Sequence, residues 1–179
     1  MSTRSRLAAS VCVLALAGCA GPAVPGTPNL GRVATAGEVA GWDVSIPPDG
    51  AGLPPGHGTS AAGATVFEQK CQTCHGDKGA GQPNDRLVGG HGTLASKTPV
   101  RTIGSYWPYA TTVFDYVRRA MPYTQSHSLS DDEVYAVTAY LLHLNGIIGA
   151  ADVMDAQTLP KVKMPNRDNF ILAYPARPK

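Results

Sequence analysis

Two cysteines and a histidine stand close together in the stretch KCQTCHGDKGAGQ, at residues 70–82. Cys71 and Cys74 are separated by two residues, and His75 follows the second cysteine directly. This C-x-x-C-H spacing is typical of c-type haem attachment, in which the two sulfurs form thioethers and the imidazole is the proximal ligand of the iron. The motif therefore predicts one covalently bound haem, held by Cys71, Cys74 and His75.

A C-x-x-C pair also occurs in zinc sites and in thioredoxin-like redox centres. A zinc site needs a second pair of ligands, and a redox dithiol is expected in a βαβ context. The other two of the four cysteines are Cys12 and Cys19, near the N-terminus. The sequence offers neither a second pair of zinc ligands nor the context of a redox dithiol, so haem attachment is the favoured interpretation.

The N-terminal residues have the pattern of a signal peptide. Arg4 and Arg6 precede the apolar run 7–17, which is far shorter than the roughly 20 residues of a membrane-spanning helix. A segment of this kind is removed during export and does not remain as a membrane span.

The cysteine that follows this run is a candidate for lipidation. The sequence LAGC, which ends at Cys19, resembles the lipobox of bacterial lipoproteins, whereas the preceding ALA offers an ordinary cleavage site. Lipidation is favoured because ordinary cleavage would leave a free thiol in an oxidising compartment. We therefore expect a signal peptide over residues 1–18 and a periplasmic protein anchored to a membrane surface through a lipid on Cys19.

The charge of the chain argues against a nucleic-acid partner. The chain has 15 basic and 13 acidic residues, and removal of the signal peptide takes away two arginines. The mature chain is then formally neutral and lacks the basic stripe that nucleic-acid binding requires. No nucleic-acid partner is expected.

Residues 19–60 are expected to form a tether. The stretch 20–63 contains ten glycines and seven prolines among 44 residues, a composition that rarely builds a core. One short piece differs, because Trp42, Val44 and Ile46 alternate with polar residues. This piece is predicted to lie extended against the domain through its apolar face.

Helical patterning is confined to the middle of the chain. It predicts one helix from about Ala61 into the haem motif, a second over about Thr111–Arg119, and a third over 130–145. The third begins with a capping box of Ser130 and Glu133. A glycine-rich loop and a Met-Pro loop connect the three.

This order of helices and loops resembles a class I cytochrome c. The resemblance implies that the first and last helices cross tightly, for which Gly63 and Phe67 on one helix and Ala139 and Tyr140 on the other are suitable. It implies an all-α fold of about three to five helices around one haem, in a cytochrome c domain over residues 61–150.

The same resemblance implies a methionine as the distal iron ligand. Met121 lies 46 residues after His75, in the Met-Pro loop where the family places this residue. Methionine and histidine together raise the reduction potential and suit electron transfer. Met121 could instead fill a gap in the core. Other candidates for the distal position are Met164, which also precedes a proline, His91 and His127, and, with less support, His57 and His143.

Hydrogen-bond donors gather in the loop before the second helix, within KTPVRTIGSYWPYAT at residues 97–111. Arg101, Ser105, Tyr106 and Trp107 can each donate a hydrogen bond. They are predicted to hold the haem propionates, with plain core packing of the two aromatic residues as the alternative.

Four stretches resemble the SoxD-type cytochrome c subunit of sulfane or sulfite dehydrogenases. They are AGWDVSIPPDGAGLPPG, GSYWPYATTVFDYVRRAMPY, LSDDEVYAVTAYLLHLNGII and VMDAQTLPKVKMPNRDNF, and the similarity extends over residues 39–171. The resemblance implies an electron-transfer subunit that is no enzyme by itself. Its electrons would come one at a time from a molybdopterin-containing dehydrogenase subunit and pass to a downstream cytochrome c. The alternatives are another periplasmic dehydrogenase as donor, or a haem enzyme or sensor with an open distal site.

The C-terminal extension, residues 151–179, has apolar residues in no helical or alternating period. An irregular segment cannot bury such residues through its own secondary structure. It is predicted either to wrap around the cytochrome domain or to dock on the partner, and a disordered tail is the alternative.

Overall fold

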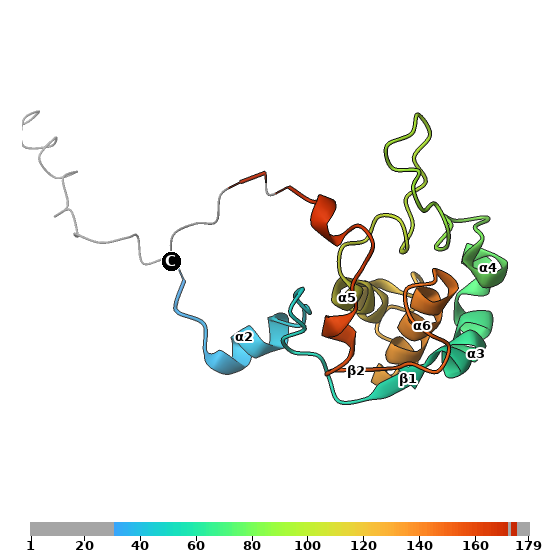
Figure 1. The fold of residues 1–179 in the computed structure, drawn as a ribbon. Helices are drawn as coiled ribbons and strands as arrows, with labels where there is room; N and C mark the ends of the chain where they lie inside the picture. Colours follow the sequence, from blue (N-terminus) through green and yellow to red (C-terminus); the bar gives the residue numbers. More distant parts are fainter. Residues whose placement is uncertain (1–30, 172, 175–179) are drawn as a thin grey trace, which may run out of the picture. The chain divides into compact units, whose positions relative to one another are not determined.

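The computed structural model describes residues 31–171, 173 and 174. The chain divides into two compact units between Asp43 and Val44. Helix α2 (Ala36–Trp42) belongs to the first unit, and the other helices and strands belong to the second (Figure 1). The predicted signal peptide and the predicted lipidation site at Cys19 lie outside the described residues.

Helix α2 lies within the stretch that was expected to be a tether. Thr35 is its N-cap and forms a reciprocal capping box with Glu38, which satisfies backbone donors of the first turn. Trp42 is the last residue of this helix. The prediction that Trp42 belongs to an extended piece is therefore wrong.

The described residues of the second unit are mainly helical, with one short pair of strands (Figure 1). In chain order its elements are β1 (His57–Thr59), α3 (Ser60–Lys70), α4 (Gln72–His75), η1 (Asp77–Gly79), α5 (Ala110–Ala120), α6 (Asp131–Leu144), β2 (Val153–Asp155), η2 (Leu159–Lys161) and η3 (Arg167–Asn169). The predicted all-α cytochrome fold is confirmed. Helices α3 and α4 together, α5, and α6 correspond to the three predicted helices.

Helices α3 and α6 cross at a point where there is no room for a side chain. A Cβ on Gly63 would lie 1.9 Å from the carbonyl oxygen of Ala136, so only glycine permits this approach. Beside the crossing, the rings of Phe67 and Tyr140 lie 5.5 Å apart between centroids. The predicted tight crossing is confirmed, with Ala136 in place of Ala139 at the closest approach.

Local interactions fix both ends of α6. At the start, the backbone N–H of Ser130 donates to Glu133 Oε2 at 2.8 Å, and the N–H of Glu133 donates to Ser130 Oγ at 3.3 Å. At the end, Gly146 adopts a φ of +67°, and its N–H donates to the His143 carbonyl oxygen at 2.8 Å. A left-handed glycine in this position is a common helix terminator.

Helix α5 ends at the Met-Pro loop. Its C-cap Met121 has an extended backbone with φ −121° and ψ 147°, as expected for a residue that precedes proline. The N–H of Met121 still donates to the Val117 carbonyl oxygen at 3.1 Å. The loop that carries the predicted distal ligand is therefore anchored to the last turn of α5.

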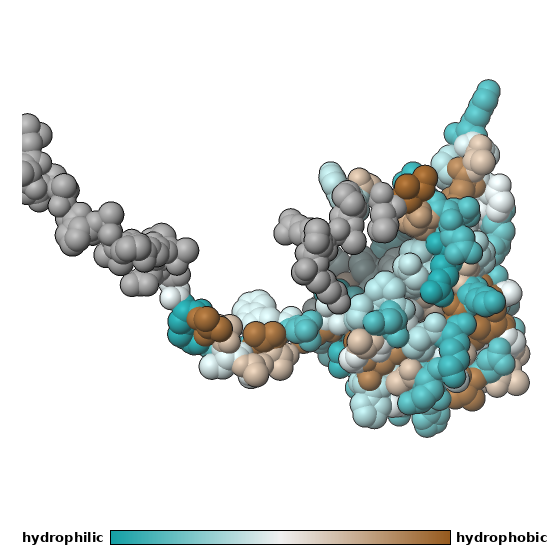
Figure 2. All heavy atoms as spheres, turned by 60° about the vertical axis from the view of Figure 1, so that its left-hand side comes forward, coloured by the Kyte–Doolittle hydropathy of each residue, from teal (hydrophilic) through white to brown (hydrophobic). Residues whose placement is uncertain are grey.

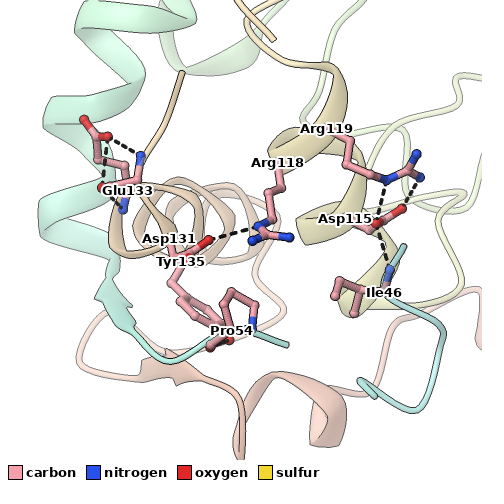
Figure 3. A network of polar contacts seen from close by, with 9 residues as sticks. Ile46, Pro54, Asp115, Arg118, Arg119, Asp131, Glu133 and Tyr135 are labelled. Atoms are coloured by element: carbon pink, nitrogen blue, oxygen red, sulfur yellow. Dashed lines mark hydrogen bonds and ion pairs between the residues drawn. The ribbon is translucent and has the colours of Figure 1, made fainter. Parts of the chain in front are cut away.

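The residues before α3 form an N-terminal strap, residues 44–59, which packs on α5 and α6. Ile46 is 3% exposed, and its N–H donates to Asp115 Oδ1 at 2.8 Å. The Tyr135 hydroxyl donates to the Pro54 carbonyl oxygen at 2.9 Å (Figure 3). Part of the expected tether thus belongs to the same compact unit as the helices, and Ile46 lies against the domain as predicted.

The residues after α6 form a C-terminal strap, residues 151–170. Strand β2 of this strap pairs antiparallel with β1 of the N-terminal strap, with Gly58 opposite Met154. Met154, Leu159 and Met164 are each no more than 4% exposed and belong to the hydrophobic core. Of the two predicted possibilities, wrapping around the domain or docking on the partner, the structure shows the first.

The surface mixes polar and apolar side chains. On the face shown in Figure 2, small hydrophobic patches lie among hydrophilic residues, which is normal for a folded domain. Exposed aromatic residues include Tyr116, Tyr123 and Phe170. Within the described part of the chain, no helix has the length and hydrophobicity needed to cross a bilayer.

Candidate haem site

The C-x-x-C-H motif forms a single helical turn at the end of α3. Cys71 is both the C-cap of α3 and the N-cap of α4, and its carbonyl oxygen accepts from the N–H of His75 at 3.0 Å. Positions three and four residues apart lie on the same side of a helical turn. The turn therefore presents both sulfurs and the imidazole on one side.

The two cysteines have different surroundings. Cys71 is half-buried and packs against the core, whereas Cys74 is exposed, and neither forms a disulfide. Burial, with a smaller contribution from the neighbouring Cys74, raises the pKa of the Cys71 thiol to about 11. Cys71 therefore lacks the lowered pKa that makes the cysteines of redox dithiols reactive.

His75 is oriented by a backbone carbonyl. Its Nδ1 lies 2.9 Å from the carbonyl oxygen of Asp85. A carbonyl oxygen can only accept, so Nδ1 carries a proton, and the lone pair of the neutral imidazole is then on Nε2. Histidine ligands of metals are commonly fixed in this way by a second hydrogen bond.

The loop after α4 folds back over the motif. The N–H of Gly81 donates to the His75 carbonyl oxygen at 2.8 Å, and the N–H of Asn84 donates to the Cys74 carbonyl oxygen at 2.9 Å. Gly76 has a φ of +75°, and a Cβ there would lie 2.4 Å from the Gly81 oxygen. This glycine is required for the turn, as expected from the glycine-rich sequence.

The candidate distal ligands differ in exposure. Met121 is half-buried and packs against the core, whereas Met164 is 4% exposed within the core. His91 and His127 are exposed. His57 is also exposed, with Nδ1 3.9 Å from Asp132, and His143 is half-buried, with Nδ1 3.4 Å from the Ile148 carbonyl oxygen.

The four residues predicted to hold the propionates have different partners. Ser105 is buried, and its hydroxyl donates to the Val100 carbonyl oxygen at 2.7 Å. The guanidinium of Arg101 lies 5.5 Å from the centre of the Tyr106 ring. Trp107 is half-buried and packs edge-on against another aromatic ring, Tyr116, at 5.7 Å. Arg101 and Tyr106 also line a hollow of about 610 Å³ on the surface.

The donors of this site fit covalent haem attachment. The motif offers two cysteine sulfurs that form no disulfide, and the contact at His75 Nδ1 leaves Nε2 as the nitrogen that could bind a metal. Met121, half-buried against the core, offers a thioether, a soft donor of the kind that haem iron accepts. Among residues 31–171, 173 and 174, no group of three or more His, Cys, Asp or Glu is arranged to hold a metal ion by itself. The described residues thus form no closed zinc site.

Comparisons with known proteins decide the family. Residues 60–145 match the family model described as Cytochrome c. A chain in the crystal structure of the sulfane dehydrogenase SoxCD from Paracoccus pantotrophus is 43% identical, with a TM-score of 0.74. The chain belongs to the cytochrome c family. Covalently bound haem c is therefore its cofactor, and the fold is that of a class I cytochrome c.

Both relatives are named as dehydrogenases of sulfur compounds. The match to the SoxCD chain covers 84% of this chain and 73% of that one. Thiosulfate dehydrogenase from Psychrobacter arcticus is 32% identical over 82 residues, which are 46% of this chain and 25% of that protein. The chain therefore aligns with only a quarter of this curated relative's length. This cytochrome c is an electron-transfer domain related to a subunit of a sulfane dehydrogenase.

Two residues near the site were missed by the sequence-based predictions. The carbonyl of Asp85 orients His75, and Asn145 binds the loop that contains Asp85. A backbone carbonyl has no sequence signal. Asn145, in contrast, directly follows the last residue of α6, and a buried amide at a helix end could have been examined as a tertiary contact.

Proposed function

We propose that this cytochrome c is a monohaem subunit that accepts single electrons from a molybdopterin-containing dehydrogenase of sulfur compounds and passes them to a downstream cytochrome c. The extent of similarity carries this proposal. The family model covers residues 60–145, whereas the match to the SoxCD chain covers 84% of this chain. Such a share must include residues from both flanking segments. Those segments distinguish this chain from a minimal cytochrome c.

Each residue of the motif has one role in the proposal. Haem c supplies a one-electron iron couple when bound. Cys71 and Cys74 bind it through thioethers, and His75 is the proximal ligand of its iron. The carbonyl of Asp85 holds the imidazole of His75 in one tautomer and one orientation.

Met121 is the proposed distal ligand. Its side chain is half-buried at the end of α5, whereas the thioether of Met164 is part of the hydrophobic core. Ligation by Met121 saturates the iron and raises its reduction potential. A saturated iron favours electron transfer over a haem enzyme or gas sensor, which would need an open position.

Arg101, Tyr106 and Trp107 remain the proposed partners of the haem propionates. Arg101 is exposed and keeps its guanidinium beside the Tyr106 ring. Ser105 is a weaker candidate because its hydroxyl already donates to a backbone carbonyl inside its own loop. Arg101→Leu should therefore disturb the propionates more than Ser105→Ala does.

The electron donor can be tested with purified proteins. Ferric holoprotein is mixed with a purified molybdopterin-containing dehydrogenase of sulfur compounds, and sulfite or thiosulfate is added while haem reduction is recorded. The proposal expects rapid reduction that depends on both the dehydrogenase and the sulfur compound. Reduction by a different dehydrogenase, and none by this one, would contradict the assignment of the donor.

The membrane anchor is a separate part of the proposal. It rests on the LAGC sequence ending at Cys19, and it places the protein in the periplasm at a membrane surface. Cys19→Ser should move the holoprotein from the membrane fraction to the soluble periplasmic fraction. Wild-type protein that is fully soluble would contradict lipidation.

A further inference from the structure

The side-chain amide of Asn145 ties the end of α6 to the loop beside the haem motif. Asn145 is 7% exposed. Its Nδ2 donates to the carbonyl oxygens of Leu87 at 3.2 Å and Leu141 at 2.8 Å, and its Oδ1 accepts from the N–H of Gly89 at 3.0 Å. Three of its hydrogen bonds therefore end on backbone atoms, two of them in the loop.

The orientation of this amide follows from its partners. The two carbonyl oxygens can only accept, so they must face the Nδ2 group of Asn145. The Gly89 N–H can only donate, so it must face Oδ1. Gly104 leaves space for the amide, since a Cβ there would lie 2.2 Å from Asn145 Oδ1. An aliphatic side chain could replace none of these bonds.

The same loop contains the carbonyl that orients the proximal histidine. Asp85 lies two residues before Leu87, and its carbonyl oxygen is the partner of His75 Nδ1. The loop is also held by a hydrogen bond that does not involve Asn145, from the N–H of Leu87 to the Gly79 carbonyl oxygen at 2.9 Å. Loss of the Asn145 bonds should therefore loosen the loop without unfolding it.

We propose that Asn145 is a positioning residue for His75. By fixing the backbone from Leu87 to Gly89, it holds the Asp85 carbonyl oxygen against His75 Nδ1 and thereby lowers the reduction potential of the holoprotein. The inference rests on the proposed role of His75 as the proximal ligand. Asn145 lies 70 positions from His75 in the sequence. The inference is that this distant residue helps to set the orientation of the ligand.

The direction of the effect follows from the hydrogen bond. A histidine ligand that donates Nδ1–H to a carbonyl is a stronger electron donor to its metal. A stronger donor stabilises ferric more than ferrous iron, which lowers the potential. Weakening the bond should therefore raise the potential.

The test compares wild-type holoprotein with Asn145→Ala in a spectroelectrochemical titration. At a fixed ambient potential near the midpoint, the ratio of reduced to oxidised haem should rise about threefold. In the ferrous protein, the His75 Nδ1 proton should exchange with solvent several-fold faster by NMR. An unchanged ratio and an unchanged exchange rate would overturn the proposal.

A second variant covers the case in which Asn145→Ala does not retain haem. Asn145→Ser should then give smaller shifts in the same direction, and the absence of any shift in Asn145→Ser would overturn the proposal.

Tyr135→Phe, within α6, is the matched control. It removes a buried hydrogen-bonding group that donates to Pro54, away from the loop. It should lower stability while the potential and the His75 proton stay unchanged, and an equal shift in this variant would overturn the specific role of Asn145. A wild-type spectrum without histidine and methionine ligation would instead contradict the proposed function, whatever the Asn145 variants show.

Discussion

Helices α3 and α6 and the two straps stabilise the same domain through different kinds of contact. The helices meet side by side at a glycine, with the backbone of Gly63 against that of Ala136. The straps are irregular, and they are held by one short strand pair and by single side chains such as Leu159 in the core. The helical crossing places the haem turn, whereas the straps pack along α5 and α6 and extend the core around them.

The polar contacts of the N-terminal strap illustrate the second kind of stabilisation (Figure 3). Asp115 on α5 accepts from the N–H of Ile46 and from Arg119. Arg118 on the same helix pairs with Asp131 at the start of α6 at 2.9 Å. The carboxylate of Asp115 thus connects the N-terminal strap to α5, and the carboxylate of Asp131 connects α5 to α6. The comparison indicates that the straps are structural parts of the domain, and the following variants test that conclusion.

Removal of the C-terminal strap should have the largest effect. Truncation after Ala151 deletes strand β2 and three core residues, Met154, Leu159 and Met164. The loss of this much buried apolar area should lower the free energy of unfolding by more than about 5 kcal/mol. Thermal unfolding of the holoprotein measures the change, and an unchanged midpoint would show that the strap is passive.

A pair of point variants sharpens the same test. Leu159 is completely buried and Ile171 is 93% exposed. Leu159→Ala should cost about 3 kcal/mol, whereas Ile171→Ala should change stability by less than about 0.5 kcal/mol. Equal effects of the two variants would contradict the packing of the strap.

Addition of one methyl group at the crossing of α3 and α6 should lower stability about as much as the loss of the Leu159 side chain. Gly63→Ala places a Cβ against the Ala136 carbonyl and should cost about 3 kcal/mol, because the two helices must move apart. Gly37→Ala in α2 is the control, since nothing lies within 4 Å of a Cβ at Gly37. Denaturant unfolding of both variants should show a large loss only for Gly63. A neutral Gly63→Ala would contradict the close crossing.

Asp115 should show a smaller, pH-dependent effect. Burial alone would raise the pKa of its carboxyl, but hydrogen bonds from Arg119 and from the Ile46 N–H outweigh burial and lower the pKa. Its stabilisation is therefore present above the unfolded-state pKa near 4 and is lost as the pH falls through the lower folded-state pKa. Asp115→Asn should cost about 2 kcal/mol at pH 7.

The control for this prediction is the pH profile itself. The difference in unfolding free energy between wild type and Asp115→Asn should shrink below about pH 4. A difference that stays constant from pH 7 to pH 3 would show that the charge of Asp115 contributes nothing.

The parts of the fold that the sequence predicted are those with local signals. The capping box of Ser130 and Glu133 marked the start of α6, and Pro122 marked the end of α5. Helix α2 has the same kind of signal in Thr35 and Glu38. It was missed because the surrounding glycines and prolines dominated the composition of the segment.

The straps and the loop contacts could not be predicted in the same way. Strands β1 and β2 have three residues each, too few for an alternating pattern, and they form only because Gly58 and Met154 meet in the folded chain. The bonds of Asn145 likewise join backbone atoms far away in the sequence. Such contacts depend on the tertiary structure and leave no periodic trace.

The ligation of the iron is the most direct test of the proposed electron-transfer role. The ferric holoprotein should show the weak long-wavelength absorption band of a methionine-ligated haem, and its ferrous form should bind carbon monoxide poorly. Met121→Ala should abolish the band and open the iron to carbon monoxide, while Met164→Ala, a change in the core, should keep the band. Loss of the band in Met164→Ala but not in Met121→Ala, or rapid carbon monoxide binding by the wild type, would contradict the account.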